Sequence, residues 1–208
     1  SNSALMTRGY YRMPSDQMFI WPERWDIPFY DESFACSSYE NCHVPWGSTH
    51  EETLKLIRDN DFISGQYIWT GFDYIGEPTP YGWPARSSFF GIVDLAGFPK
   101  DVYHLYRSEW TDETVLHLFP HWNWEPGQDV DMWCYYNDAD EVELFVNGVS
   151  KGVSRKTDDC LHTCWRVKYE LGKVEVVSRK DGAEVARKSI CTAGEPAQLR
   201  MTLNQYGE

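Results

Sequence analysis

Two patterns of hydrophobic and polar positions divide the chain near residue 110. Before this point, apolar residues fall in irregular stretches rich in Pro, Trp and Tyr, broken by a few periodic segments. After it, short segments that alternate apolar and polar residues recur at the spacing of strands and turns. The two patterns predict two domains: residues 1–110, which mix helices and strands, and residues 111–208, which are built from strands alone.

Two helices are predicted in the first domain. One begins at Ser48 or Thr49, because either side chain can cap the first turn, and Glu51 or Glu52 three residues on can complete a capping box. The other covers 99–109 and begins with a proline, which suits the first helical position. Each carries apolar residues at helical spacing, so each is expected to bury one face.

A buried strand is predicted between the two helices, over residues 66–73. The run Tyr67-Ile68-Trp69 within it is apolar and ends at a Thr-Gly pair. Residues 10–47 show no clear period and are predicted to form extended loop. The order loop, helix, strand, loop, helix is typical of a parallel α/β barrel or a doubly wound sheet. The first domain is therefore predicted to be α/β.

The second domain is predicted to be all-β. Six segments show strand-like alternation: 115–119, 132–136, 142–146, 165–169, 174–178 and 199–203. The pair Asn147-Gly148 suits a type I′ turn, because both central residues of that turn have positive φ, so residues 141–153 are predicted to form a β-hairpin. Six or seven short antiparallel strands over this length describe an immunoglobulin-like β-sandwich.

Composition and charge narrow the classes of function. The chain is 42% hydrophobic and 16% aromatic, which is enough to build a core. Its net charge of −13 argues against nucleic acid and against an anionic membrane surface as partners, because both attract clustered Lys and Arg. No apolar run approaches the roughly 20 residues that a membrane-spanning helix needs.

The six cysteines indicate neither a metal site nor a disulfide scaffold. The group Cys36…Cys42-His43 and the Cys-x-His-x-Cys group at 160–164 both lack the Cys-x-x-Cys spacing of structural zinc sites. Free thiols or one local disulfide are expected, with no metal and no cofactor.

Residues 65–94 combine aromatic with charged side chains and form the candidate functional site. Sugar rings present apolar C–H faces that stack on Trp and Tyr, and hydroxyl groups that hydrogen bond to carboxylates and guanidinium groups. The candidates for substrate binding are Trp69, Asp73, Glu77, Trp83 and Arg86. Structural alternatives stay open: a core aromatic for Trp69, a turn cap for Asp73, and neutralisation of a buried carboxylate for Arg86.

Three runs of the sequence are similar to a known enzyme family. The run IWTGFDYIGEPTPYGWP and the following RSSFFGIVDLAGFPKDVYHLYRSEW resemble the end of the catalytic barrel in glycoside hydrolase family two, which includes β-galactosidases, β-glucuronidases and β-mannosidases. The later run NDADEVELFVNGVSKG resembles a hairpin of the immunoglobulin-like domain that follows this barrel. The likeness covers nearly the whole chain and is greatest to the β-galactosidases of polysaccharide-degrading bacteria.

The resemblance implies a fold. Residues 1–110 would be the C-terminal part of a (β/α)8 TIM barrel, and residues 111–208 would be the immunoglobulin-like β-sandwich. The segment 66–73 would be the eighth barrel strand, and active sites of such barrels lie at the C-terminal ends of the strands. The resemblance places Trp69 on the floor of the sugar subsite, and makes Asp73 a candidate for pairing with substrate hydroxyls or supporting the site.

The resemblance also implies a reaction, the hydrolysis of O-glycosidic bonds by a retaining exo-β-glycosidase, most closely a β-galactosidase. Such enzymes use one acid/base carboxylate and one nucleophilic carboxylate. In the family the nucleophilic glutamate stands shortly before a segment that resembles Ser3-Ala4-Leu5…Thr7-Arg8-Gly9, and no Glu precedes Glu23 here. Both catalytic carboxylates are therefore expected upstream of Ser3, and the chain by itself is expected to be inactive.

The expected partners are a β-galactoside oligosaccharide or polysaccharide and the remainder of the catalytic barrel, without which the chain could self-associate. An exported bacterial protein, periplasmic or secreted, is expected. The alternatives are a non-catalytic carbohydrate-binding or structural sandwich, or a parent enzyme that is a β-glucuronidase or a β-mannosidase. The Trp-rich run at 121–124 could form a sugar-binding face, but we interpret it as packing between the two domains.

Overall fold

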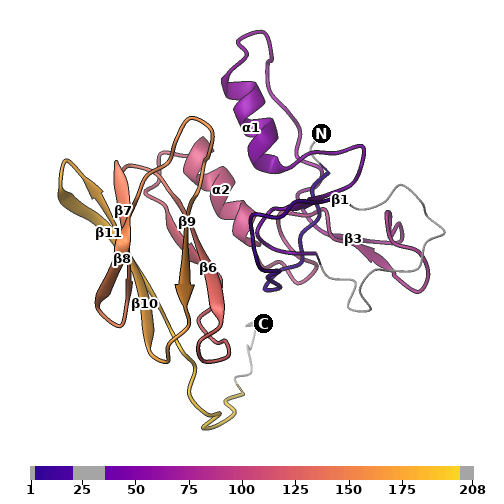
Figure 1. The fold of residues 1–208 in the computed structure, drawn as a ribbon. Coiled ribbons are helices and arrows are strands. Elements are labelled where there is room, and N and C mark those ends of the chain that lie inside the picture. The colour runs from indigo at the N-terminus through magenta and orange to yellow at the C-terminus, as the bar shows by residue number, and fades with distance from the viewer. Residues whose placement is uncertain (1–2, 21–35, 202–208) are drawn as a thin grey trace, which may run out of the picture.

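The computed structural model describes residues 3–20 and 36–201, and Figure 1 shows how its elements are arranged. The C-terminal half of the chain forms a β-sandwich. The N-terminal half packs against one side of it, partly through helix α2 (Asp101–Trp110), which contacts strands of the sandwich. Within the described ranges, no helix is long and apolar enough to cross a membrane.

The sandwich consists of two antiparallel sheets. The three-stranded sheet has the order β5-β6-β9, and the four-stranded sheet has the order β11-β10-β7-β8. The strands are β5 Leu116–Phe119, β6 Asp129–Tyr136, β7 Glu141–Val146, β8 Val149–Ser154, β9 Thr163–Lys168, β10 Lys173–Lys180 and β11 Ala183–Cys191. The prediction of a β-sandwich in this half of the chain is confirmed.

Alternating side chains build the sandwich core, since every second residue of β7 is buried. Trp122 belongs to this core: its indole is fully buried, lies edge-on to the ring of Tyr169 and donates to the carbonyl oxygen of Glu170 at 3.0 Å. The prediction that this tryptophan packs between the domains is wrong. Trp124 does approach the N-terminal half, where its ring centroid lies 6.5 Å from that of Tyr11.

The predicted hairpin is confirmed at the turn between β7 and β8. Asn147 and Gly148 both have positive φ, at 50° and 82°. Strand β11 was not predicted, because it is an exposed edge strand whose residues show no apolar alternation. The predicted strand 199–203 is wrong at residues 199–201, which are not in a strand, and its last two residues lie outside the described part of the chain.

Helix α1 (His50–Arg58) begins where the capping pattern predicts. The Thr49 hydroxyl accepts the backbone N–H of Glu52 at 3.2 Å, and the Glu52 carboxylate accepts the backbone N–H of Thr49 at 2.9 Å. Helix α2 begins two residues later than predicted, which leaves Pro99 outside it. The reason is that Lys100 is extended and its backbone N–H is already bonded to another loop.

The predicted buried strand over 66–73 is wrong. Tyr67 is 92% exposed, and residues 66–69 have no strand partner among the residues that the structure describes. The backbone of residues 70–73 instead bonds to residues 90–93, with N···O distances of 2.9–3.0 Å. A strand needs a hydrogen-bonded neighbour along its length, and here only the last part of the segment has one.

Two short strand pairs complete the N-terminal half. Strand β1 (Phe19–Ile20) runs parallel to β2 (Cys42–His43), and β3 (Tyr74–Ile75) runs antiparallel to β4 (Ser87–Ser88). Residues 10–20 and 36–47 otherwise follow the predicted irregular course, and residues 21–35 lie outside the described part.

The two halves share a hydrophobic core. It contains Met6 and Leu105 from the N-terminal half and Phe119, Trp133 and Tyr135 from the sandwich. Because these side chains are buried together, the position of the N-terminal loops is set partly by the sandwich on which they rest.

Candidate functional site

The loop that carries most of the predicted substrate-binding residues is closed by β3 and β4. Their antiparallel pairing brings the ends of residues 76–86 together, and this loop contains Glu77, Trp83 and Arg86. All three side chains are exposed. The Arg86 guanidinium lies over the Trp83 ring, 5.4 Å from its centroid, so the loop offers an aromatic face next to a cation. Arg86 therefore contacts an aromatic ring in this structure, while neutralisation of a buried carboxylate had been the alternative.

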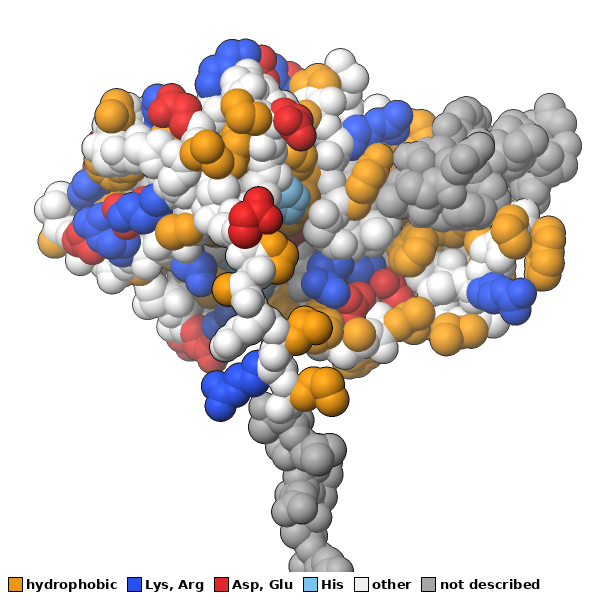
Figure 2. All heavy atoms as spheres, turned by 90° about the horizontal axis from the view of Figure 1, so that it is seen from below, with side chains coloured by type: hydrophobic (Ala, Val, Ile, Leu, Met, Phe, Trp, Pro, Cys, Tyr) orange, Lys and Arg blue, Asp and Glu red, His pale blue; other side chains and the backbone are white. Residues whose placement is uncertain are grey.

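Trp69 precedes this loop, with 47% of its surface exposed and its ring edge-on to Tyr74 at a centroid distance of 6.3 Å. Figure 2 shows hydrophobic side chains gathered on the side of the molecule that carries β3, at the right of the view. The large exposed apolar residues of the segment 67–98, which contains β3, are Tyr67, Trp69, Phe72, Ile75, Trp83, Leu95 and Phe98. So many are typical of a surface that binds a ligand or is covered by more protein.

Asp73 does not share this exposed surface. Its side chain is only 3% exposed, and one carboxylate oxygen accepts hydrogen bonds from the Lys100 ammonium at 2.7 Å and from the Gly91 N–H at 2.8 Å. Burial raises the pKa of Asp73 and lowers that of Lys100, while the charge of each partner opposes the shift of the other. Direct pairing of Asp73 with substrate hydroxyls would require this internal contact to open, so the geometry favours the supporting role.

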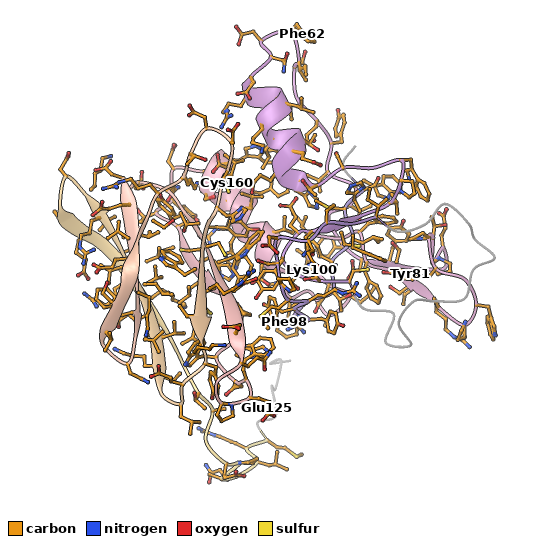
Figure 3. All side chains as sticks on the ribbon, viewed as in Figure 1. Phe62, Tyr81, Phe98, Lys100, Glu125 and Cys160 are labelled. Carbon is orange, nitrogen blue, oxygen red and sulfur yellow. The ribbon has the colours of Figure 1, made fainter. Side chains whose placement is uncertain are left out.

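Lys100 is a candidate functional residue that was not predicted from the sequence (Figure 3). Its side chain is 1% exposed, and the ammonium donates to the carbonyl oxygens of Met6 at 2.6 Å and Phe89 at 3.2 Å as well as to Asp73. These partners lie 94, 11 and 27 positions away in the chain. No local pattern can therefore mark this lysine as buried, and its only local signal is its place directly before a helix.

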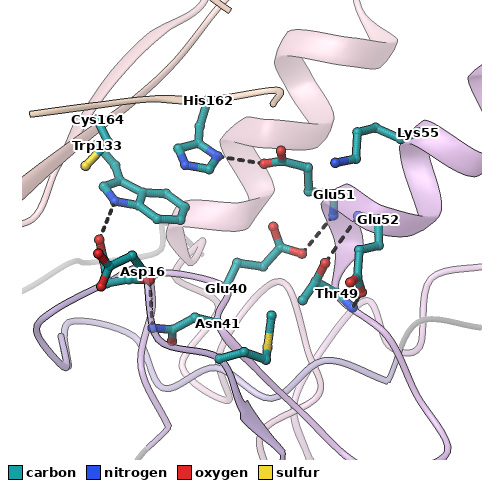
Figure 4. Close-up of a pocket in the computed structure, with 12 residues that line it drawn as sticks. Asp16, Glu40, Asn41, Thr49, Glu51, Glu52, Lys55, Trp133, His162 and Cys164 are labelled. Carbon is teal, nitrogen blue, oxygen red and sulfur yellow. Dashed lines mark hydrogen bonds and ion pairs between the residues drawn. The ribbon is translucent and has the colours of Figure 1, made fainter. Parts of the chain in front are cut away.

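A second group of ionisable side chains lies around a cavity of about 320 Å³ between α1 and β9 (Figure 4). Glu51 Oε2 lies 2.7 Å from His162 Nδ1. Burial by itself would lower the pKa of His162, but hydrogen bonds with Cys160 and Glu51 outweigh burial and raise the pKa to about 9. Burial opposes the shift of Glu51, whose pKa is nevertheless lowered by His162. This pair is therefore ionised near neutral pH. Burial, and then the charge of Glu51, raise the pKa of Glu40 well above its ordinary value.

The same cluster contains side chains of the kinds that bind metals. Glu51, Cys160 and His162 each offer one ligand atom within 4.8 Å of the others, and zinc accepts oxygen, sulfur and nitrogen ligands. The 2.7 Å between Nδ1 and Oε2 is, however, the distance of a charge-assisted hydrogen bond. The second oxygen of Glu51 accepts the backbone N–H of Leu161 at 2.8 Å. The ion pair accounts for this geometry, so we assign the cluster to the joint between α1 and the sandwich.

Comparison with known proteins finds similar sequences and similar structures. A family model described as a domain of unknown function, DUF4982, matches residues 127–186, within the sandwich. The chain is 78% identical over 202 residues to the β-galactosidase BoGH2A of Bacteroides ovatus, a match that covers 97% of this chain and 24% of that protein. The crystal structure of a β-glycosidase from Bacteroides vulgatus matches with a TM-score of 0.82 and 32% identity, covering 98% of this chain and 28% of that one. A glycosyl hydrolase family 2 member from Bacteroides cellulosilyticus matches with a TM-score of 0.62 and 28% identity, covering 70% of this chain and 24% of that one.

The chain belongs to glycoside hydrolase family 2. The resemblance to this family, and to its β-galactosidases in particular, is confirmed. The chain spans about a quarter of the length of the B. ovatus relative. Of the five residues predicted to bind substrate in this family 2 chain, the structure leaves Trp69, Glu77, Trp83 and Arg86 exposed around β3 and β4, while it buries Asp73 against Lys100.

Proposed function

We propose that the protein containing this chain is a retaining exo-β-glycosidase, and specifically a β-galactosidase. The observation that carries the proposal is the 78% identity to the β-galactosidase of B. ovatus across 97% of this chain. Residues 1–110 would form the last part of its (β/α)8 barrel, with an immunoglobulin-like sandwich following at 111–208. The substrate would be a β-galactoside oligosaccharide or polysaccharide.

The exposed apolar surface around Trp69 supports the barrel assignment. A barrel closes only when each strand has two neighbours, and the 66–69 segment has none among the described residues. In the proposed enzyme the remainder of the barrel would supply these neighbours and cover side chains such as Tyr67 and Phe72. Without that cover, the same surface would favour self-association of the chain.

Trp69 would provide the aromatic face on which the terminal sugar stacks. Its indole is 47% exposed, so part of the ring is accessible to the C–H face of a galactose ring. The loop with Glu77, Trp83 and Arg86 would contribute further contacts to hydroxyl groups. Asp73 would hold the loop in place from within the protein.

The bond-breaking steps require two carboxylates about 5–5.5 Å apart in a retaining enzyme. One carboxylate attacks the anomeric carbon while the other, as an acid, protonates the leaving oxygen. Water then hydrolyses the glycosyl-enzyme intermediate with the second group acting as base. We place both carboxylates upstream of Ser3, so this chain would contribute the sugar-binding wall of the site and not its reacting groups.

The test is the hydrolysis of aryl β-glycosides by the full-length protein and by the 208-residue chain. We expect the full-length protein to hydrolyse the β-galactoside with retention of configuration, and the chain to show no turnover. In the full-length protein, Trp69→Ala should lower kcat/KM by at least roughly tenfold. Trp110→Ala is the matched control, because Trp110 is similarly exposed, at 54%, at the end of α2.

Two outcomes would change the proposal. Turnover by the isolated chain would overturn the placement of the carboxylates. Faster hydrolysis of the β-glucuronide or the β-mannoside would favour those activities of the parent enzyme. A non-catalytic binding module built on Trp122 is not favoured, because that indole is fully buried in the sandwich core.

A further inference from the structure

We propose that Lys100 is a positioning residue, which fixes the segment bearing Trp69 relative to residues 3–8 and thereby sets the place of the bound sugar with respect to the nucleophile. This inference rests on the proposed function. The buried ammonium donates to three groups that belong to three separate segments of the chain.

All three N–H groups of the ammonium have an acceptor. They are the carbonyl oxygen of Met6 at 2.6 Å, the carboxylate of Asp73 at 2.7 Å and the carbonyl oxygen of Phe89 at 3.2 Å. The side chain is 1% exposed, so water does not compete for these bonds. One cation therefore joins the N-terminal segment, the sugar-facing segment and the segment that leads from β4 to α2.

The sugar-facing segment is held directly after Trp69. The backbone of residues 70–73 bonds to residues 90–93. Lys100 binds both segments. Its ammonium donates to Asp73 and to the Phe89 carbonyl oxygen, and its backbone N–H donates to the Ile92 carbonyl oxygen at 2.9 Å. The position of the Trp69 backbone thus depends on a pair of segments that this single residue clamps at three points.

The N-terminal segment is tied to the same point. The Met6 N–H donates to the Phe89 carbonyl oxygen at 3.0 Å, and the Met6 carbonyl oxygen accepts from Lys100. Met6 is fully buried. In the proposed enzyme the nucleophile stands shortly before Ser3, a few residues from this anchor. Lys100 would therefore relate the stacking face for the sugar to the strand end that delivers the nucleophile.

Stability alone does not explain a buried ion pair of this kind. Replacing such a pair by apolar groups of similar size is often neutral or stabilising, because both charges lose their hydration on burial. Removing one partner leaves the other charge buried without compensation. A single variant leaves one charge buried and unpaired, whereas a double variant removes both charges. Comparing the two separates the cost of an unpaired charge from the role of the pair itself.

The experiment uses the full-length protein and compares Lys100→Met, the double variant Lys100→Met/Asp73→Asn, and Lys156→Met as control. Lys156 pairs with Glu109 of α2 at 2.7 Å, so it links α2 to the sandwich, whereas Lys100 joins segments within the N-terminal half. We expect Lys100→Met to lower the Tm. The double variant should recover much of the Tm while its kcat for an aryl β-galactoside stays at least roughly tenfold below wild type, because misplacement of the sugar slows the chemical step. The control should keep the wild-type kcat and KM.

A second readout links the effect to Trp69. If Lys100 acts through the position of that indole, Trp69→Ala should reduce kcat/KM much less in the double-variant background than in wild type. The inference would be overturned if the double variant kept the wild-type kcat, or if Trp69→Ala had the same effect in both backgrounds. Either result would mean that the contacts of Lys100 are only structural. A wild-type protein that hydrolyses none of the glycosides would instead overturn the proposed function, and the positioning role with it.

Discussion

The imidazole of His162 lies flat against the indole of Trp133, with ring centroids 3.6 Å apart and ring planes 7° from parallel. Trp133 lies on β6, and His162 directly precedes the neighbouring strand β9, so the two rings stack at one edge of the β6–β9 pair. Glu51 of α1 binds the same imidazole at its Nδ1 atom, 2.7 Å from a carboxylate oxygen. The contact joins residues 111 positions apart and fastens the first helix to the sandwich.

This ion pair predicts a pH dependence of stability. The pKa of His162 is raised from 6.5 to about 9, so its contribution is complete below pH 6.5 and is lost as the pH rises through 9. The pKa of Glu51 is lowered from 4.5, so its contribution is present above pH 4.5 and is lost on acidification. The pair should therefore stabilise the protein most between pH 4.5 and 6.5. We expect a loss on the order of 3 kcal/mol from the histidine between pH 6.5 and 9.5.

The measurement is the free energy of urea unfolding at several pH values for wild type and Glu51→Gln. The variant should show a much shallower decline in stability above pH 6.5. Glu109→Gln is the control, because its carboxylate pairs with Lys156 and does not contact a histidine. An unchanged slope in Glu51→Gln would mean that the pair does not link folding to proton binding.

The capping box of α1 predicts a modest, local stability change. Thr49→Ala removes the hydroxyl that accepts the Glu52 N–H and should lower the free energy of unfolding by about 1 kcal/mol. Thr49→Ser keeps a hydroxyl and should retain most of this stability. Urea unfolding measured by far-UV circular dichroism checks the order, and equal stability of the Ala and Ser variants would contradict it.

Gly91 predicts a steric effect where two segments touch. A Cβ atom at this position would lie 2.1 Å from the backbone nitrogen of Asp73, and backbone atoms cannot give way as a flexible side chain can. Gly91→Ala should therefore destabilise the protein by about 3 kcal/mol or more. Gly71→Ala, at a position with nothing within 4 Å, should change the Tm little. Similar Tm values for the two variants would show that the segments can separate without loss.

Two tryptophans of opposite environment predict opposite outcomes. Trp122 is fully buried in the sandwich core, so Trp122→Ala should lower the free energy of unfolding by about 3–5 kcal/mol. Trp83 is 81% exposed, so Trp83→Ala should change it by less than about 0.5 kcal/mol. Chemical unfolding followed by circular dichroism compares them, and a small effect of Trp122→Ala would contradict the assignment of this residue to the core.

The features predicted correctly from the sequence are those whose information is local. The capping pair is three residues apart, and the Asn147-Gly148 turn forms within the hairpin that it closes. Strand β7 shows its buried face through a period of two. The edge strand β11 could not be predicted in this way, because an exposed strand needs no apolar face. Family membership also followed from local runs of residues.

Beyond these elements, the sequence by itself determined that the C-terminal half is a β-sandwich, which turn folds its hairpin, where α1 is capped and which aromatic residues are candidates for a sugar site. Only the tertiary structure decided that Asp73 faces inward, that Lys100 binds it, and that Glu51 meets His162. Hydrogen bonds and ion pairs form between atoms that folding brings within about 3 Å. Asp73 and Lys100 are 27 positions apart in the chain, and Glu51 and His162 are 111 apart, so no local pattern of residues can predict these contacts.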